Sequence, residues 1–102
     1  MIGLDTNVLA RYYVDDAADK EATRQRMGAK RLIESGRALM VATTVLLEFE
    51  WVLRGYYEFS RKQIAAVFEH LLALPHMSVQ NETAVRAALL SYTEGFDFAD
   101  AR

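Results

Sequence analysis

Three carboxylates stand where apolar stretches give way to predicted helices, and their spacing suggests a shared site. Asp5 ends the apolar opening of the chain, Glu48 lies near the start of a helix that follows a second apolar stretch, and Asp100 lies in a helix start near the other end. Helix N-termini gather at the carboxyl ends of parallel strands, where open α/β sheets bind ligands. We therefore expect these three acids to converge on one crevice.

Converging carboxylates predict a metal site. Like charges in a partly desolvated pocket raise one another's pKa unless a cation compensates them. Mg²⁺ and Mn²⁺ prefer oxygen ligands, keep several waters and activate one of those waters beside a phosphodiester. The pattern therefore predicts metal-dependent phosphoryl chemistry and leaves the substrate open.

Asp5 and Asp100 also have a purely structural explanation, because each lies in a cluster of residues that is typical of a helix start. Asp5, Thr6 and Asn7 form a good helix-start cluster, in which the Thr6 hydroxyl caps a helix that begins at Asn7. Asp97 is an acceptable N-cap for a helix that contains Asp100 three residues later. Capping and chemistry both remain open for these residues.

The predicted helix 45–54 carries Glu48 at the edge of its apolar stripe. At about 100° per residue, Glu48 falls about 40° from Val52, whereas Glu50 points away from the stripe. A carboxylate there is costly to desolvate unless a partner receives it. Either the helix N-terminal amides or a metal ion would serve for Glu48.

Strand and helix alternate along the chain, which predicts an α/β fold with a parallel sheet and helices on its faces. The opening strand is apolar enough to be covered on both faces. The expected strands are 1–5, 39–42 and 76–80. The expected helices are a short one after Asp5, 17–35, 45–54 with Thr43 or Thr44 as cap, one from the Ser60–Gln63 capping box to Pro75, and one from an Asn81 cap to Gly95.

Composition bounds the class of protein. A length of 102 residues predicts a single domain, 1–102, and 52% hydrophobic with 25% charged residues is typical of a folded soluble chain. The sequence carries neither a membrane-length apolar run nor the basic start of a signal peptide, so we expect the cytoplasm. With no cysteine and a net charge of -2, a metal would bind to oxygen and a polyanion would be held locally.

Aromatic and histidine side chains allow more than one use. Tyr56, Tyr57 and Phe59 form a cluster for which we favour core or dimer packing over stacking on bases. His70 and His76 have no partners at metal-ligand spacing, so we expect surface or hydrogen-bonded roles for them.

Three blocks of sequence together carry a family resemblance: 2–9, 43–48 with 51–53 behind it, and 96–101. In order and spacing they resemble the PIN domain, particularly the VapC-like toxins of bacterial type II toxin-antitoxin pairs, over essentially the whole chain. The resemblance implies a three-layer α/β/α fold with a central parallel sheet. It further implies a Mg²⁺- or Mn²⁺-dependent endoribonuclease that is commonly a homodimer and is inhibited by a cognate VapB-like antitoxin.

The resemblance also assigns roles to residues. It implies catalytic and metal-binding roles for three acids: Asp5, Glu48 and Asp100. It implies substrate-binding roles for four polar residues: Thr6, Asn7, Thr44 and Asp97.

The chain departs from this family pattern after the third acid. Family members continue through a helix, a strand with a fourth acidic position and often one more strand, whereas this chain stops at Arg102. We therefore expect a PIN domain that lacks its C-terminal strands and leaves one side of the opening strand bare.

Three alternatives remain beside an active nuclease. One is a catalytically inactive PIN-like fragment that serves as a dimerisation or antitoxin-binding module. A phosphotransferase of the haloacid dehalogenase type would need a second aspartate where Asn7 stands. A response-regulator receiver would need an adjacent acidic pair and a later lysine.

Overall fold

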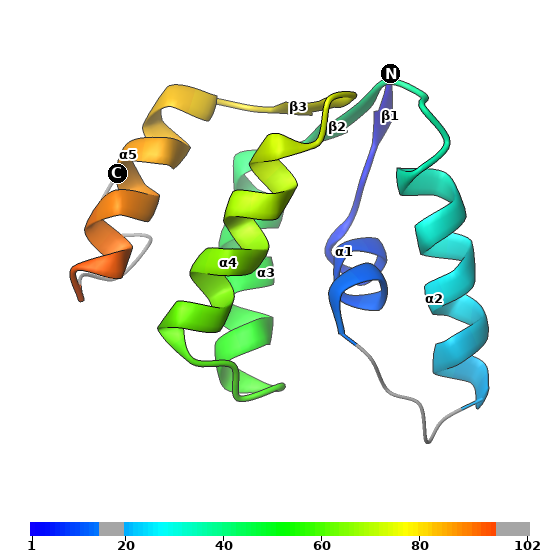
Figure 1. Cartoon of the computed structure of the whole chain (residues 1–102), viewed down its shortest axis with the longest axis horizontal. Helices are drawn as coiled ribbons and strands as arrows, with labels where there is room; N and C mark the ends of the chain where they lie inside the picture. Colours follow the sequence, from blue (N-terminus) through cyan, green and yellow to red (C-terminus); the bar gives the residue numbers. More distant parts are fainter. Residues whose placement is uncertain (15–19, 96–102) are drawn as a thin grey trace.

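A computed structural model describes residues 1–14 and 20–95 of the chain. Figure 1 shows α1, α3 and α5 leading away from the strands while α2 and α4 return to them. In the described residues the elements are β1 (Ile2–Gly3), α1 (Thr6–Tyr13), α2 (Lys20–Ile33), β2 (Leu39–Val41), α3 (Thr43–Gly55), α4 (Arg61–Ala73), β3 (Met77–Val79) and α5 (Glu82–Thr93). The predicted α/β alternation is confirmed, and the strands are one to three residues shorter than expected.

The three strands form one parallel sheet in the order β1-β2-β3. In the register, Ile2 faces Leu39, and Leu39 faces Met77. A pair of antiparallel helices makes each crossover between neighbouring strands (Figure 1). Because the strands are parallel, their carboxyl ends and the starts of α1, α3 and α5 lie at one edge of the sheet.

Only one face of the described sheet is buried. Leu39 and Val41 are buried in β2, while Met40 between them is 39% exposed. Gly3 and Ser78, the register partners of Met40, are exposed as well. Side chains alternate between the two faces of a strand, so this exposed row marks one face. The expectation that the opening strand is covered on both faces is therefore wrong for the described part of the chain.

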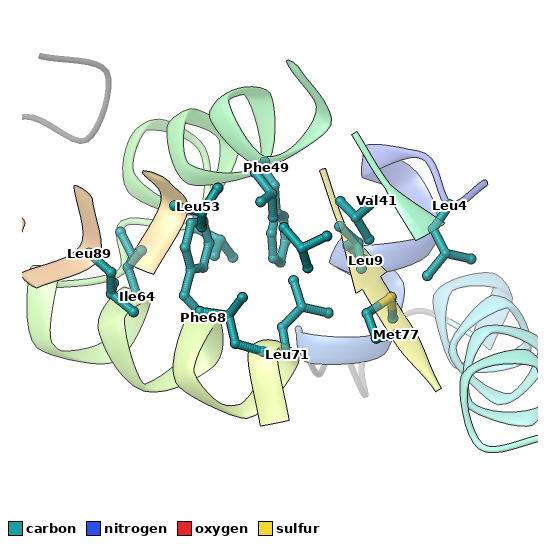
Figure 2. Close-up of a cluster of buried hydrophobic side chains, with 14 of the residues drawn as sticks. Leu4, Leu9, Val41, Phe49, Leu53, Ile64, Phe68, Leu71, Met77 and Leu89 are labelled. Carbon is teal, nitrogen blue, oxygen red and sulfur yellow. The ribbon is translucent and has the colours of Figure 1, made fainter. Parts of the chain in front are cut away.

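The buried face of the sheet joins a core built mainly by the helices. Phe49 of α3 and Phe68 of α4 stack with ring centroids 5.9 Å apart at 11°. Figure 2 shows Leu9, Leu71 and Val41 converging on this aromatic pair from α1, α4 and β2. The core thus locks α1 to α3 and α4, which fixes the start of α1 against the sheet edge.

Helix starts differ from the predicted caps where neighbouring residues supply the hydrogen bonds. The Ser60–Gln63 capping box is confirmed, with both reciprocal bonds present. Helix α3 instead begins at Thr43 without a side-chain cap, because the Thr43 backbone N–H donates to Gln80 Oε1 at 3.0 Å. Asn81 is the N-cap residue of α5, as predicted, but its backbone is left-handed and its side chain makes no capping hydrogen bond. Its Nδ2 instead donates to Thr43 Oγ1 at 3.4 Å. The end of β3 is thereby tied to the start of α3.

Strand β1 is at an edge, since it pairs only with β2 in the part of the chain that the structure describes. The strand predicted over 1–5 is only two residues long, because Asp5 already caps α1. We still expect the chain to self-associate or to need a partner on this side, since edge strands recruit further strands. Sedimentation and hydrogen exchange test this. A stable monomer with strongly protected amides in residues 2–5 would contradict it.

None of the described helices combines the length and hydropathy needed to cross a bilayer.

Candidate functional site at the carboxyl edge of the sheet

The carboxyl ends of β1 and β2 bring Asp5 next to the start of α3. The Leu4 N–H donates to Met40 O at 2.8 Å, so the two strands leave the sheet side by side. Helices α1 and α3 then pack against each other. Asp5 and Thr44, which were predicted to share a site, therefore lie on adjacent elements at the same edge.

Asp5 caps helix α1 and is exposed to solvent. Its Oδ1 accepts a hydrogen bond from the Val8 N–H at 2.9 Å. The prediction that Thr6 is the cap is therefore wrong, because Thr6 opens the helix itself and is only 8% exposed. Asn7 is exposed in the first turn. The N-terminal end of a helix favours a negatively charged side chain, which suits Asp5 as the cap.

Helix α3 presents Glu48 to solvent and buries Glu50, the reverse of the predicted orientation. The buried face is centred near Leu46, with Glu50 about 40° and Glu48 about 160° away. The predicted stripe omitted Leu46 and was centred too far toward Val52. Glu48 therefore shares the outer face of α3 with Thr44, one turn earlier.

Glu50 is tolerated in the interior because two donors meet its carboxylate. Tyr92 Oη donates to Glu50 Oε2 at 3.0 Å, and Arg54 Nε donates to the same oxygen at 2.8 Å. A buried carboxylate without such partners would be costly. This acid therefore fastens α5 to α3 and does not belong to the sheet edge.

The described residues contain only part of the predicted metal site. Asp97 and Asp100 lie outside them. Among residues 1–14 and 20–95, no three histidine or acidic side chains are grouped to hold a metal ion. The donors that are described, the exposed carboxylates of Asp5 and Glu48, are hard oxygen ligands of the kind that suits Mg²⁺ or Mn²⁺.

A groove of about 440 Å³ runs between α1 and α2 and begins at the first acid. Asp5 and Asn7 lie in its wall. Sequence reasoning missed the rest of the lining: Val8, Arg11, Gln25, Gly28, Ala29 and Leu32. Gly28, inside the predicted helix 17–35, was the one signal in the sequence for this groove. Glycine destabilises a helix relative to alanine, so its presence there suggests another use for the position.

No protein-family model, curated protein or solved structure matches this chain. The resemblance to the PIN domain therefore rests on the sequence blocks alone.

A second groove of about 440 Å³ lies between the end of α1, α2 and α4. In its wall, Tyr13 Oη and His70 Nδ1 are hydrogen-bonded at 2.8 Å, and Tyr12 Oη donates to Glu34 Oε2 at 3.0 Å. Burial raises the pKa of Tyr13 well above its usual value. The prediction of a hydrogen-bonded surface role for His70 is confirmed.

The aromatic cluster after α3 is divided between core and solvent. Tyr57 and Phe59 are half-buried against the core, as predicted. Tyr56 is 77% exposed and meets the Tyr57 ring edge-on at 4.8 Å. Its outward ring is left for contacts outside the fold.

Proposed function

We propose that this chain is a metal-dependent endoribonuclease of the PIN type, similar to VapC-like toxins. The three-layer α/β/α architecture of that family would require a further layer on the sheet face that is exposed in the described residues. The observation that carries the proposal is the position of Asp5, an exposed carboxylate at the carboxyl edge of a parallel sheet, beside the start of α3. Ligand sites of α/β proteins lie at this edge. The open groove that begins at Asp5 gives an extended substrate a path to it.

The proposed roles follow from residue chemistry. Asp5, Glu48 and Asp100 would hold Mg²⁺ or Mn²⁺, which when bound neutralises phosphate charge and activates water. Asn7 and Thr44, exposed in the first turns of α1 and α3, offer polar side chains beside backbone N–H groups that favour phosphate.

Two further residues were assigned to the substrate. Thr6 is buried, so its side chain is nearly inaccessible to a substrate. It would therefore act only indirectly, by supporting the residues at the surface. Asp97 keeps its substrate-binding role as a proposal.

The proposal includes partners and location. We propose that RNA is the substrate and that a VapB-like antitoxin is the inhibitor. We further propose that the chain forms a homodimer and acts in the cytoplasm. Trp51 and Leu90 are large apolar side chains that are 65% and 69% exposed, which suits burial against another protein.

A binding module without catalysis is the second candidate, and the Asp5 cap favours it. The cap bond to Val8 gives the Asp5 carboxylate a structural use without any metal. Such a module would retain dimerisation or antitoxin binding. It differs from the nuclease by a single observable, metal-dependent cleavage of RNA.

The first test is cleavage of single-stranded RNA by this chain with Mg²⁺, Mn²⁺, Ca²⁺ or EDTA. We expect cleavage with Mg²⁺ or Mn²⁺ and little with Ca²⁺, whose coordination is looser. Full activity in EDTA would contradict the metal mechanism. Absence of cleavage under all conditions, with a folded chain, would favour the binding module.

The second test measures Mn²⁺ binding by calorimetry. Glu48→Gln and Asp100→Asn should each weaken binding, by about tenfold or more, because each removes an anionic ligand. Glu69→Gln is the matched control, since Glu69 is exposed on α4 away from the sheet edge. Unchanged affinity in both test variants would show that these acids do not share a metal.

A further inference from the structure

We propose that the groove between α1 and α2 binds an unpaired RNA nucleotide adjacent to the bond cleaved near Asp5, and that Gly28 keeps space for its base. This inference deepens the proposed function and rests on it. It assigns a place for one nucleotide of that substrate to a surface that includes Asp5 of the candidate site.

The size and floor of the groove suit a nucleobase. Its volume of about 440 Å³ is within the range of pockets that hold small ligands, and is too small for a duplex. Val8, Ala29 and Leu32 supply apolar surface for the face of a base. RNA-binding proteins commonly read bases that are unpaired and splayed out of a stack.

The groove wall carries polar side chains that can contact the phosphate and the base of a nucleotide. Arg11 lies in the groove wall six residues after Asp5, about 9 Å along α1, so it can hold a neighbouring phosphate. Gln25 Nε2 donates to Glu21 Oε1 at 3.3 Å, which orients its amide group. Asn7 adds a second amide near the acid. Side-chain amides form paired hydrogen bonds with base edges.

Gly28 is the observation that sets this groove apart from an ordinary helix contact. It lies in the interior of α2, where glycine destabilises the helix relative to alanine. A Cβ at this position would meet nothing within 4 Å, so close packing does not require glycine. Its helical backbone does not require glycine either, because only Gly36 and Gly95 have a positive φ among the described glycines. What the glycine provides is open space in the groove.

The test fills this space. We expect Gly28→Leu to weaken binding of a labelled single-stranded RNA of mixed sequence by about tenfold or more, measured by fluorescence anisotropy in EDTA so that the RNA stays intact. Gly55→Leu is the matched control, because Gly55 is also helical, exposed and free of atoms within 4 Å of a Cβ. It should bind like the wild type. Equal affinity of Gly28→Leu and wild type, or no binding by either, would overturn the proposal.

Two further measurements define the ligand. Arg11→Gln should reduce the slope of log affinity against log salt concentration by about 0.7, the value for one phosphate contact on a single strand. A duplex of the same sequence should compete poorly, and equal competition would overturn the requirement for an unpaired nucleotide. An unchanged salt slope would overturn the phosphate contact of Arg11.

Failure of this inference is distinct from failure of the proposed function. RNA binding that depends on Gly28, without any metal-dependent cleavage, would support the groove and contradict the nuclease. Metal-dependent cleavage with an unaffected Gly28→Leu variant would support the nuclease and contradict the groove.

Discussion

Asp5→Asn should leave the chain folded and reduce metal-dependent RNA cleavage by at least about 100-fold, because a metal-centred stabilisation of several kcal/mol corresponds to a factor of this size. Asparagine and aspartate are nearly equal as N-caps, so the hydrogen bond from the Val8 N–H is retained. Removal of the charge typically costs about 0.3–1 kcal/mol through the helix dipole. The substitution therefore separates the chemistry of the carboxylate from its structural use.

Asp5→Ala completes the comparison. It removes both the cap and the metal ligand, so it should lose cleavage to the same extent and also lose about 1 kcal/mol of stability. Urea unfolding and a cleavage assay on both variants provide the measurement. If Asp5→Asn cleaves RNA like the wild type, capping is the whole role of this residue and the proposed site is wrong.

The sequence predicted the elements well because their signals are local. The Ser60–Gln63 capping box, the apolar stripe of α4 and the three short apolar strands depend on residues close together in the chain, and the structure contains all of them. The parallel order of the sheet follows from strands that alternate with helices. These features need no knowledge of distant contacts.

The predictions that failed depended on distant partners. Thr43 needs no side-chain cap because Gln80, which is 37 residues later, accepts its N–H. The orientation of Glu50 depends on Tyr92 of α5, which is 42 residues away. The projection of 45–54 placed the wrong glutamate at the margin because its stripe omitted Leu46, and a projection of one helix cannot show that Tyr92 supplies the partner that a buried Glu50 needs. The groove at Asp5 likewise needs the packing of α2 on α1 before Gly28 and Arg11 can be recognised.

The chain should lose stability as the pH rises from about 10 to about 12, and Tyr92 should contribute a part of this loss that can be isolated. This side chain is 1% exposed. Burial, followed by the charge and hydrogen bond of Glu50, raises its pKa from 10.0 to about 12. Above pH 10 the unfolded chain releases the proton that the folded chain retains, so unfolding becomes more favourable. Two pKa units correspond to about 2–3 kcal/mol.

Tyr92→Phe isolates this contribution. It keeps the ring under Arg61, whose Cζ lies 4.5 Å from the ring centroid, and deletes the hydroxyl that donates to Glu50. At neutral pH the variant should be less stable by about 1.5–3 kcal/mol, the usual effect of a hydrogen bond to a charged group. Urea unfolding from about pH 8 to 11.5 should show this difference shrinking above pH 10, because only the wild type loses the Tyr92 contribution.

Lysine titration and the raised pKa values of Tyr12 and Tyr13 affect both proteins equally, so they cancel in the comparison. Tyr56→Phe is the matched control: Tyr56 is 77% exposed, and its removal should change stability little at any pH. A stability difference between Tyr92→Phe and wild type that stays constant from neutral pH to 11.5 would show that the Tyr92 proton is not held by the fold. The hydrogen bond from Tyr92 to Glu50 would then contribute little to stability, and packing alone would hold α5 against α3.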